Sequence, residues 1–175
     1  MKNVFEIVII NSKYCSFLRK YDNRVCYNAG SKKLRPFIGV LFRVKNNEYY
    51  APLSSPKPKH SELKNTLDLI KIENGKLGVI NFNNMLPVTK NNYKIIDLNK
   101  KPDNIAEKHR LELLNKQSRW LNSHSKEIYK KSRLLYNLYI HNKLPDKVKN
   151  RCCNFLLLEE KCKIYDLQKN GTTKK

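Results

Sequence analysis

Hydroxyl and cationic side chains are concentrated in one short segment of this 175-residue chain, Ser54-Ser-Pro-Lys-Pro-Lys-His60. Pro52 and Pro56 keep the segment out of a helix, because proline fixes its own φ and biases the preceding residue toward extended conformations. A stiff strand end that presents two hydroxyls beside two ammonium groups and an imidazole suits a phosphodiester ligand. The alternative is a solvated loop after an edge strand, and this segment alone does not separate the two.

The composition of the chain favours a polyanionic partner. Thirty-six Lys and Arg residues oppose 15 Asp and Glu, which leaves a formal net charge of +21 and a pI of about 9.8. Self-repulsion on this scale destabilises a compact chain, so nucleic acid is the leading candidate for the partner. An anionic membrane is the second candidate, but no segment alternates a clean apolar face with a lysine-rich one.

The acidic residues do not follow the pattern of a metal-dependent nuclease. Such an enzyme needs clustered carboxylates to hold Mg²⁺, whereas Asp22, Asp68, Asp97 and Asp103 are scattered along the chain. The other route is attack by the 2′-hydroxyl of RNA itself, which gives a 2′,3′-cyclic phosphate and a 5′-hydroxyl. This route needs only orientation, proton transfer and stabilisation of the phosphorane charge. We therefore expect no metal or other cofactor and no cleavage of DNA, which lacks the nucleophile.

Length and cysteine usage indicate the general class of protein. A chain of 175 residues fits one domain. The five cysteines are odd in number and form no opposed CxxC pairs, which favours buried free thiols in a reducing cytosol. No apolar run is long enough to span a membrane, and residues 1–10 are not followed by a signal-peptide cleavage site. We expect a soluble, cytoplasmic protein.

The elements that must position the serine segment change in type along the chain. β-Branched and aromatic runs predict strands over residues 4–10, 37–44, 49–53, 69–73, 77–80, 85–88 and 93–98. Asn46-Asn47 and Asn74-Gly75 between these runs are typical of turns. The first hundred residues are therefore predicted to supply a sheet.

Helical spacing dominates the chain after its first hundred residues, and one short helix is also predicted near the N-terminus. A short helix is predicted from Ser12, as its N-cap, to residue 21, and residues 22–34 are predicted to be a mobile basic loop. Two longer helices are predicted at about 104–124 and, with Ser125 as N-cap, at 125–142. Strands first and helices second predict one α+β domain over residues 1–167, a small curled sheet or barrel with packed helices. Residues 168–175 are expected to be a disordered tail.

Several blocks of residues, spread in order over nearly the whole chain, resemble one known family. They are residues 12–14, Leu18 and 21–22; 37–40; 50–57 and His60; 77–81; Met85; 116–117; and 153–161. The family is ToxN/AbiQ, the protein toxins of type III toxin–antitoxin systems. The resemblance implies an endoribonuclease on a MazF-like, SH3-like barrel. It also implies that a small repeat RNA, folded as a pseudoknot, inhibits the toxin in a ring-shaped complex, and that the system acts in phage defence by abortive infection.

The resemblance also assigns catalytic roles. Ser55 matches the family's catalytic serine, and Ser54 stands where relatives keep a hydroxyl. Lys57 is expected to hold the phosphate. Arg35 stands where the family has a functional lysine, and since arginine cannot release a proton, Lys33 is the alternative for proton transfer. A covalent serine nucleophile is not expected, because the chain has no GxSxG elbow.

A further set of residues is expected to contact RNA. It consists of Tyr14, Lys33, Lys59, His60, Lys116, Gln117 and Arg119. Tyr14 matches a family tyrosine that faces RNA, and its alternative is a core aromatic residue. His60 could shuttle protons, but a loop histidine that contacts phosphate or nothing is the favoured interpretation. The helical group at 116–120 suits stacking of an unpaired base beside backbone contacts, although Trp120 itself is expected in the core.

These observations predict a sequence-preferring, metal-independent endoribonuclease toxin. Its expected partners are the pseudoknot antitoxin RNA and cellular or phage RNA, with no membrane and no DNA. The alternative is an RNA-binding protein without catalysis, which the basic composition fits equally well. A nuclease should lose activity but not affinity on Ser55→Ala, whereas a binding module has no need of this residue.

Overall fold

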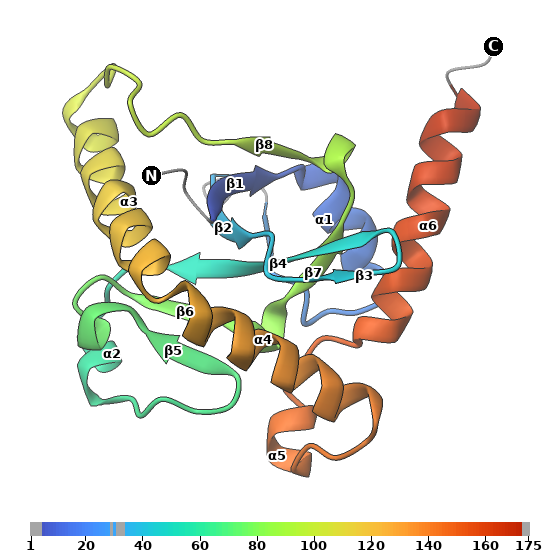
Figure 1. The fold of residues 1–175 in the computed structure, drawn as a ribbon. Coiled ribbons are helices and arrows are strands. Elements are labelled where there is room, and N and C mark those ends of the chain that lie inside the picture. Colours follow the sequence, from blue (N-terminus) through green and yellow to red (C-terminus); the bar gives the residue numbers. More distant parts are fainter. Residues whose placement is uncertain (1–4, 29, 31–33, 173–175) are drawn as a thin grey trace.

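Eight strands pair into one open antiparallel sheet in the computed structural model, which describes residues 5–28, 30 and 34–172 (Figure 1). The strands are β1 (Glu6–Ile10), β2 (Pro36–Gly39), β3 (Arg43–Val44), β4 (Asn47–Ser54), β5 (Leu69–Lys71), β6 (Val79–Asn81), β7 (Leu86–Val88) and β8 (Tyr93–Ile95). Their order is β5-β6-β4-β2-β1-β8, and β3 and β7 each pair with β4. The expected α+β class is confirmed, and the pairing path is an open sheet.

Strand β4 is the centre of this sheet, because two strands pair along each of its edges. Along one edge, Ile38 of β2 pairs with Ala51, and Arg43 of β3 pairs with Glu48. Between these two pairs the chain advances by five residues from β2 to β3 but by only three residues on β4. The segment that joins β2 and β3 therefore contains two extra residues, which form a bulge. The single strand predicted over 37–44 is therefore two strands. The turn lies at residues 45–46, one residue before the prediction, and Asn47 already belongs to β4.

The other edge of β4 is interrupted in the same way. Ser54 pairs with Val79 of β6, and Tyr49 pairs with Pro87 of β7, while the 3₁₀ turn Phe82–Asn84 separates the two strands. The hairpin predicted around Asn74-Gly75 is confirmed, since β5 and β6 pair antiparallel through the 3₁₀ turn Ile72–Gly75. A third 3₁₀ turn, Lys90–Asn92, precedes β8.

Six α-helices pack around this sheet within the described residues. They are α1 (Ser12–Arg19), α2 (Lys59–Glu62), α3 (Ile105–Ser123), α4 (Ser125–Ile140), α5 (Asp146–Lys149) and α6 (Phe155–Thr172). In Figure 1, α3 and α4 follow one another diagonally across the sheet, whereas α6 stands at the far right, where it packs on β7 and α1. None of the described helices is both long and apolar enough to cross a membrane.

The helix starts differ from the predictions in two places. The N-cap of α1 is Asn11, whose side chain accepts hydrogen bonds from the backbone N–H of Lys13 and Tyr14, so Ser12 is already the first helical residue. Helix α4 starts at Ser125, and its N-cap is His124. The buried face of α3 is as predicted and contains Leu111, Leu114, Ser118 and Leu121.

The C-terminal helix encloses a buried carboxylate. Phe155 and Leu158 of α6 are buried, and Glu159 accepts hydrogen bonds from the hydroxyls of Tyr49 and Tyr136, both at 2.7 Å. Cys15, Cys152, Cys153 and Cys162 are buried free thiols, as expected, whereas Cys26 is only half-buried. Helix α6 continues through Thr172, so residues 168–172 of the expected tail are helical, while 173–175 lie outside the described residues.

The loop after α1 is held in place where the structure describes it. Asp22 is buried and forms an ion pair with Arg24, and its carboxylate accepts a hydrogen bond from the backbone N–H of Asn154 at 2.6 Å. The side chain of Asn28 donates to the carbonyl of Ile10 at 2.7 Å. The prediction of a mobile loop is therefore wrong for residues 22–28, because buried polar contacts fix them.

Candidate functional site

A cleft of about 430 Å³ opens where the end of β4, the start of β2 and the middle of α3 meet. Its polar lining residues are Arg35, Ser54, Ser55, Lys57, Arg110 and Gln117. All four residues predicted to be catalytic are among them, although Arg35 is distant in sequence from the serines. We call this site the Ser55 cleft.

The two serines lie at the point where β4 ends. Ser54 is the last residue of the strand, and its half-buried hydroxyl oxygen accepts a hydrogen bond from Nδ2 of Asn81 at 3.0 Å. Since that bond uses the oxygen as acceptor, the hydroxyl proton of Ser54 stays available for a ligand. Ser55 follows the strand and is exposed in the cleft, as is Lys57.

The turn before β6 supports the serines from behind. Gly78 has φ +100°, and a Cβ built on it would lie 1.9 Å from the carbonyl oxygen of Ser54. Its neighbour Leu77 accepts a hydrogen bond through its carbonyl from Nε2 of Gln117 at 2.7 Å. Helix α3, the turn at 77–78 and the serines are therefore held in one fixed arrangement.

The charge of the cleft is positive. Arg35, Lys57 and Arg110 line it, and none of its described lining residues is Asp or Glu. Arg110 donates a hydrogen bond to the carbonyl of Leu34 at 3.0 Å, and burial lowers the pKa of its guanidinium, with Glu107 opposing that shift. The cleft can therefore stabilise a phosphoryl group that gains negative charge.

Arg110 and Asn81 were missed as site residues in the sequence. Arg110 could have been found by helix periodicity, because it lies seven residues before Gln117 and so on the same face of α3. Asn81 ends the block 77–81 that resembles the ToxN/AbiQ family, but no periodicity in the sequence indicates its contact with Ser54. Its contact with Ser54 exists only because β6 pairs with the end of β4.

The three expected RNA-contacting residues of α3 do not share one site. Gln117 is buried at the Ser55 cleft, whereas Lys116 and Arg119 line a neighbouring pocket of about 480 Å³ beside Trp120. Successive helical residues point about 100° apart, so this division is what a helix imposes. Trp120 is half-buried and stacks on His124, with ring centroids 3.9 Å apart.

Tyr14 is a core residue. Its ring is fully buried against Tyr165, its hydroxyl donates to the carbonyl of Pro87 at 2.5 Å, and burial raises its pKa well above the usual value. The core alternative for Tyr14 thus describes the structure, and the ring has no exposed face for RNA.

His60 differs from the loop histidine that was expected. It lies in α2 with 3% of its surface exposed, and its Nδ1 has no hydrogen-bond partner among the described residues. Burial lowers the pKa of the imidazole, and Lys57 and Lys59 lower it further. Lys59 is exposed on α2, while Lys33 lies outside the described residues.

Candidate metal ligands are dispersed. No group of three His, Cys, Asp or Glu side chains in the described part of the chain could hold a metal ion. The polar side chains that line the Ser55 cleft are hydroxyl, cationic and amide groups.

Comparisons with family models and with known proteins identify the same family. The family model described as toxin ToxN of type III toxin–antitoxin systems matches residues 6–163. Endoribonuclease ToxN of Pectobacterium atrosepticum is 32% identical over 171 residues, which covers 93% of this chain and 95% of the relative.

Two solved structures share the fold. One, from work on a processed non-coding RNA that regulates a bacterial antiviral system, has a TM-score of 0.75 and 30% identity and covers 90% of this chain and 97% of its own. The other concerns selective inhibition of a type III toxin by a non-coding RNA pseudoknot. It has a TM-score of 0.78 and 26% identity and covers 93% of this chain and 98% of its own.

Proposed function

Because this chain belongs to the ToxN family of type III toxin–antitoxin toxins and is an endoribonuclease by that homology, we propose that it cleaves RNA in the Ser55 cleft by a metal-independent attack of the substrate's own 2′-hydroxyl. The observation that carries this proposal is the lining of the cleft. Two serine hydroxyls and three cationic side chains line it, and no carboxylate does so among the described residues. This set suits stabilisation of a phosphorane.

The reaction proceeds by one displacement at phosphorus. A bond forms between the 2′-oxygen and phosphorus as the bond from phosphorus to the 5′-oxygen breaks. The 2′-hydroxyl loses its proton to a base, and the leaving 5′-oxygen takes up a proton, which gives 2′,3′-cyclic phosphate and 5′-hydroxyl ends.

The polar residues of the cleft have different roles in this step. Ser55 contacts the scissile phosphate or the 2′-hydroxyl, and Ser54 donates its proton to a phosphoryl oxygen. Lys57, Arg35 and Arg110 stabilise the added negative charge. Arg35 does not transfer protons, since guanidinium stays charged. Lys57 is therefore the candidate general acid within the described cleft.

The proposed partners follow from the family and the charge. We propose that a small pseudoknot RNA inhibits the toxin in a ring-shaped complex, and that cellular or phage RNA is cut, with some sequence preference, in abortive infection. A net charge of +21 supports polyanionic partners. The structurally similar proteins concern non-coding RNA regulation of an antiviral system and inhibition by a pseudoknot.

The finer fold assignment is also a proposal. We propose that the sheet is related to the MazF-like, SH3-like barrels. What supports this is the central strand β4, along which two pairs of interrupted strands bend the sheet on both edges.

The test is cleavage of total cellular RNA by the purified protein in EDTA, with end-group analysis of the fragments. Ser55→Ala should abolish cleavage while RNA affinity is kept, and Ser16→Ala, an exposed serine of α1, is the matched control. Fragments with cyclic phosphate ends that form with wild type and with Ser16→Ala, but not with Ser55→Ala, would support the proposal. Intact RNA, bound equally by wild type and Ser55→Ala, would leave an RNA-binding protein without catalysis.

A further inference from the structure

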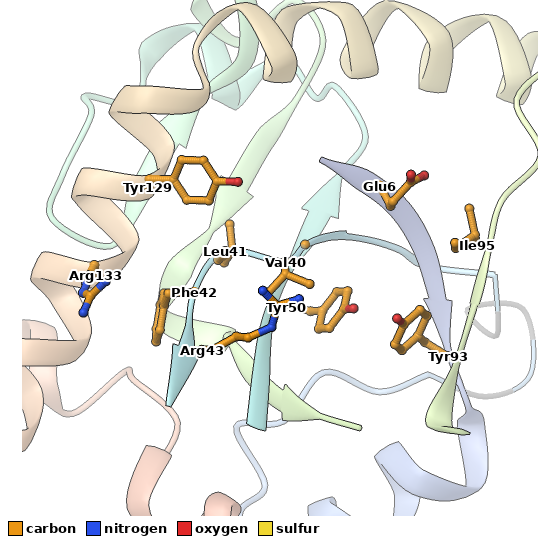
Figure 2. A pocket seen from close by; sticks show the side chains of 11 residues that line it. Glu6, Val40, Leu41, Phe42, Arg43, Tyr50, Tyr93, Ile95, Tyr129 and Arg133 are labelled. Atoms are coloured by element: carbon orange, nitrogen blue, oxygen red, sulfur yellow. The ribbon is translucent and has the colours of Figure 1, made fainter. Parts of the chain in front are cut away.

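A second pocket, of about 440 Å³, shares no lining residue with the Ser55 cleft. Figure 2 shows Tyr129 and Arg133 entering it from α4 on one side and Tyr93 and Ile95 from β8 on the other, with Tyr50 and Arg43 between them. Its polar side chains are Glu6, Arg43, Tyr50, Tyr93, Tyr129 and Arg133. We call it the Tyr50 pocket.

Three strands place the tyrosine at its floor. Glu6 of β1 pairs with Gly39 of β2, and the ring of Tyr50 on β4 lies directly against Gly39. A Cβ on Gly39 would be 2.3 Å from Cδ1 of Tyr50, so only glycine leaves room for the ring in this position. The rings of Tyr50 and Tyr93 are 5.0 Å apart and tilted by 43°. Tyr50 itself is buried, with 1% of its surface exposed, whereas Tyr93 and Tyr129 are only half-buried.

A buried carboxylate beneath the pocket fixes two of its side chains. Glu48, 7% exposed, accepts hydrogen bonds from Arg43 at Nε (3.1 Å) and Nη2 (2.8 Å), and from the hydroxyl of Tyr50 (3.1 Å). Arg43 still has N–H groups that Glu48 does not use. Arg133 is exposed and makes no hydrogen bond or ion pair with the described residues. The pocket thus offers one guanidinium group held by Glu48 and one that is exposed.

We infer that the Tyr50 pocket binds one unpaired ribonucleotide, with its base against the partly exposed side chains of Tyr93 and Tyr129 and its phosphate on Arg43 and Arg133. A nucleotide combines a flat π-face with an anion, and this pocket combines aromatic rings with two guanidinium groups. Glu6 supplies an acceptor for an N–H of the base. The volume lies in the range of small-molecule sites. The inference rests on the proposed function, since a free RNA strand is the source of such a nucleotide.

The pocket is close enough to the cleft for one RNA to occupy both. Tyr50 and Ser54 lie four residues apart on β4, which corresponds to about 13 Å along a strand. An RNA that just spans the cleavage site does not extend that far, whereas an RNA with longer flanks does. The bound nucleotide could come from the cleaved strand or from a regulatory RNA, and the chemistry of recognition is the same.

The test compares Arg133→Gln with Lys130→Gln, which removes the same charge from an exposed position of the same helix. Binding is measured in a Ser55→Ala background with a short single-stranded RNA, a longer one extended on both sides, and a folded pseudoknot RNA with single-stranded flanks. We expect the double variant Arg133→Gln/Tyr93→Leu to bind the long or the folded RNA at least tenfold more weakly, because stacking contributes about 1–3 kcal/mol per base. The short RNA should bind and, with Ser55 present, be cleaved as by wild type.

The arms of the experiment identify the source of the nucleotide. Weaker binding of the long linear RNA would show that the nucleotide comes from the substrate. Weaker binding of the folded RNA alone would show that it comes from a regulatory RNA. Photo-cross-linking should attach the RNA to the peptide with Tyr93 or Tyr129. Equal binding of all RNAs by the Arg133→Gln/Tyr93→Leu and Lys130→Gln variants, in a protein that still cleaves RNA, would overturn the inference and leave the proposed function intact. Absence of cleavage by wild type would instead remove the proposed function.

Discussion

Gly78 lies against the carbonyl group of Ser54 so closely that a Cβ at position 78 would be 1.9 Å from the carbonyl oxygen. The residue before it, Leu77, accepts the hydrogen bond from Gln117 of α3. One two-residue turn therefore joins the helix that supplies Arg110 to the strand end that supplies both serines. The geometry of the Ser55 cleft depends on this turn.

Gly78→Ala should remove activity and destabilise the fold. The left-handed φ of +100° and the clash with backbone together should cost at least about 3 kcal/mol in the free energy of unfolding. Urea unfolding and RNA cleavage measure the two effects. Gly30→Ala is the matched control, because Gly30 also has a positive φ but no atom within 4 Å of its Cβ position. A Gly78 variant as active as the Gly30 variant would contradict the role of the turn.

Asn81→Ala should lower kcat about tenfold with little change in KM, because Asn81 holds the hydroxyl of Ser54 and does not line the cleft itself. Steady-state kinetics on a short RNA measure this. Asn83→Ala is the control, since the side chain of Asn83 donates to the carbonyl of Arg151 instead. In the double variant Ser54→Ala/Asn81→Ala the loss should equal that of Ser54→Ala alone. Additive losses would show that Asn81 acts independently of Ser54.

Arg110→Gln should lower kcat/KM and make binding of single-stranded RNA less dependent on salt. One phosphate contact contributes about 0.7 to the slope of log K against log salt. The comparison is Lys108→Gln, an exposed lysine of the same helix. The same slope for both variants would exclude a phosphate contact by Arg110.

Glu159→Ala should destabilise the protein by about 2–4 kcal/mol, because the hydroxyls of Tyr49 and Tyr136 would lose their acceptor in the core. Glu159→Gln keeps an acceptor oxygen and should cost less. Glu160→Ala, at an exposed side chain, should change stability by less than about 0.5 kcal/mol. Thermal and urea unfolding give the values, and similar costs at positions 159 and 160 would refute the assignment.

Acid should weaken the ion pair between Asp68, which precedes β5, and Arg151, which precedes α6. Burial raises the pKa of Asp68, but hydrogen bonds from Arg151 and Thr66 outweigh it, and the net pKa lies below the usual 3.8. The folded state thus holds the carboxylate charged. Its stabilisation is present above the unfolded pKa and is lost as pH falls through the folded pKa.

Asp68→Asn should therefore be less stable than wild type at neutral pH and approach it in acid. Urea unfolding between neutral pH and the folded pKa of Asp68 measures the difference, and Arg151→Gln should give the same profile because it removes the same ion pair. A constant difference at every pH would show that ionisation of Asp68 is not involved.

Local sequence determined the elements that short-range chemistry specifies. The turn residues Asn74-Gly75 predicted the hairpin, and the spacing of Leu111, Leu114, Ser118 and Leu121 predicted the buried face of α3. The serine segment between prolines identified the hydroxyls and Lys57 that line the cleft. In each case the signal lies within a few residues, where φ preferences and helical periodicity act.

Only the tertiary structure decided which side chains face the site. The sequence permitted Tyr14 and His60 at the surface, yet both are buried, because the packing of α1 against α6 and of α2 against the 3₁₀ turn at 72–75 covers them. Arg110, Asn81 and Gly78 belong to the site through contacts with residues at least 24 positions away in the sequence. Such contacts depend on how strands pair and helices pack, and no local pattern of residues encodes that pairing by itself.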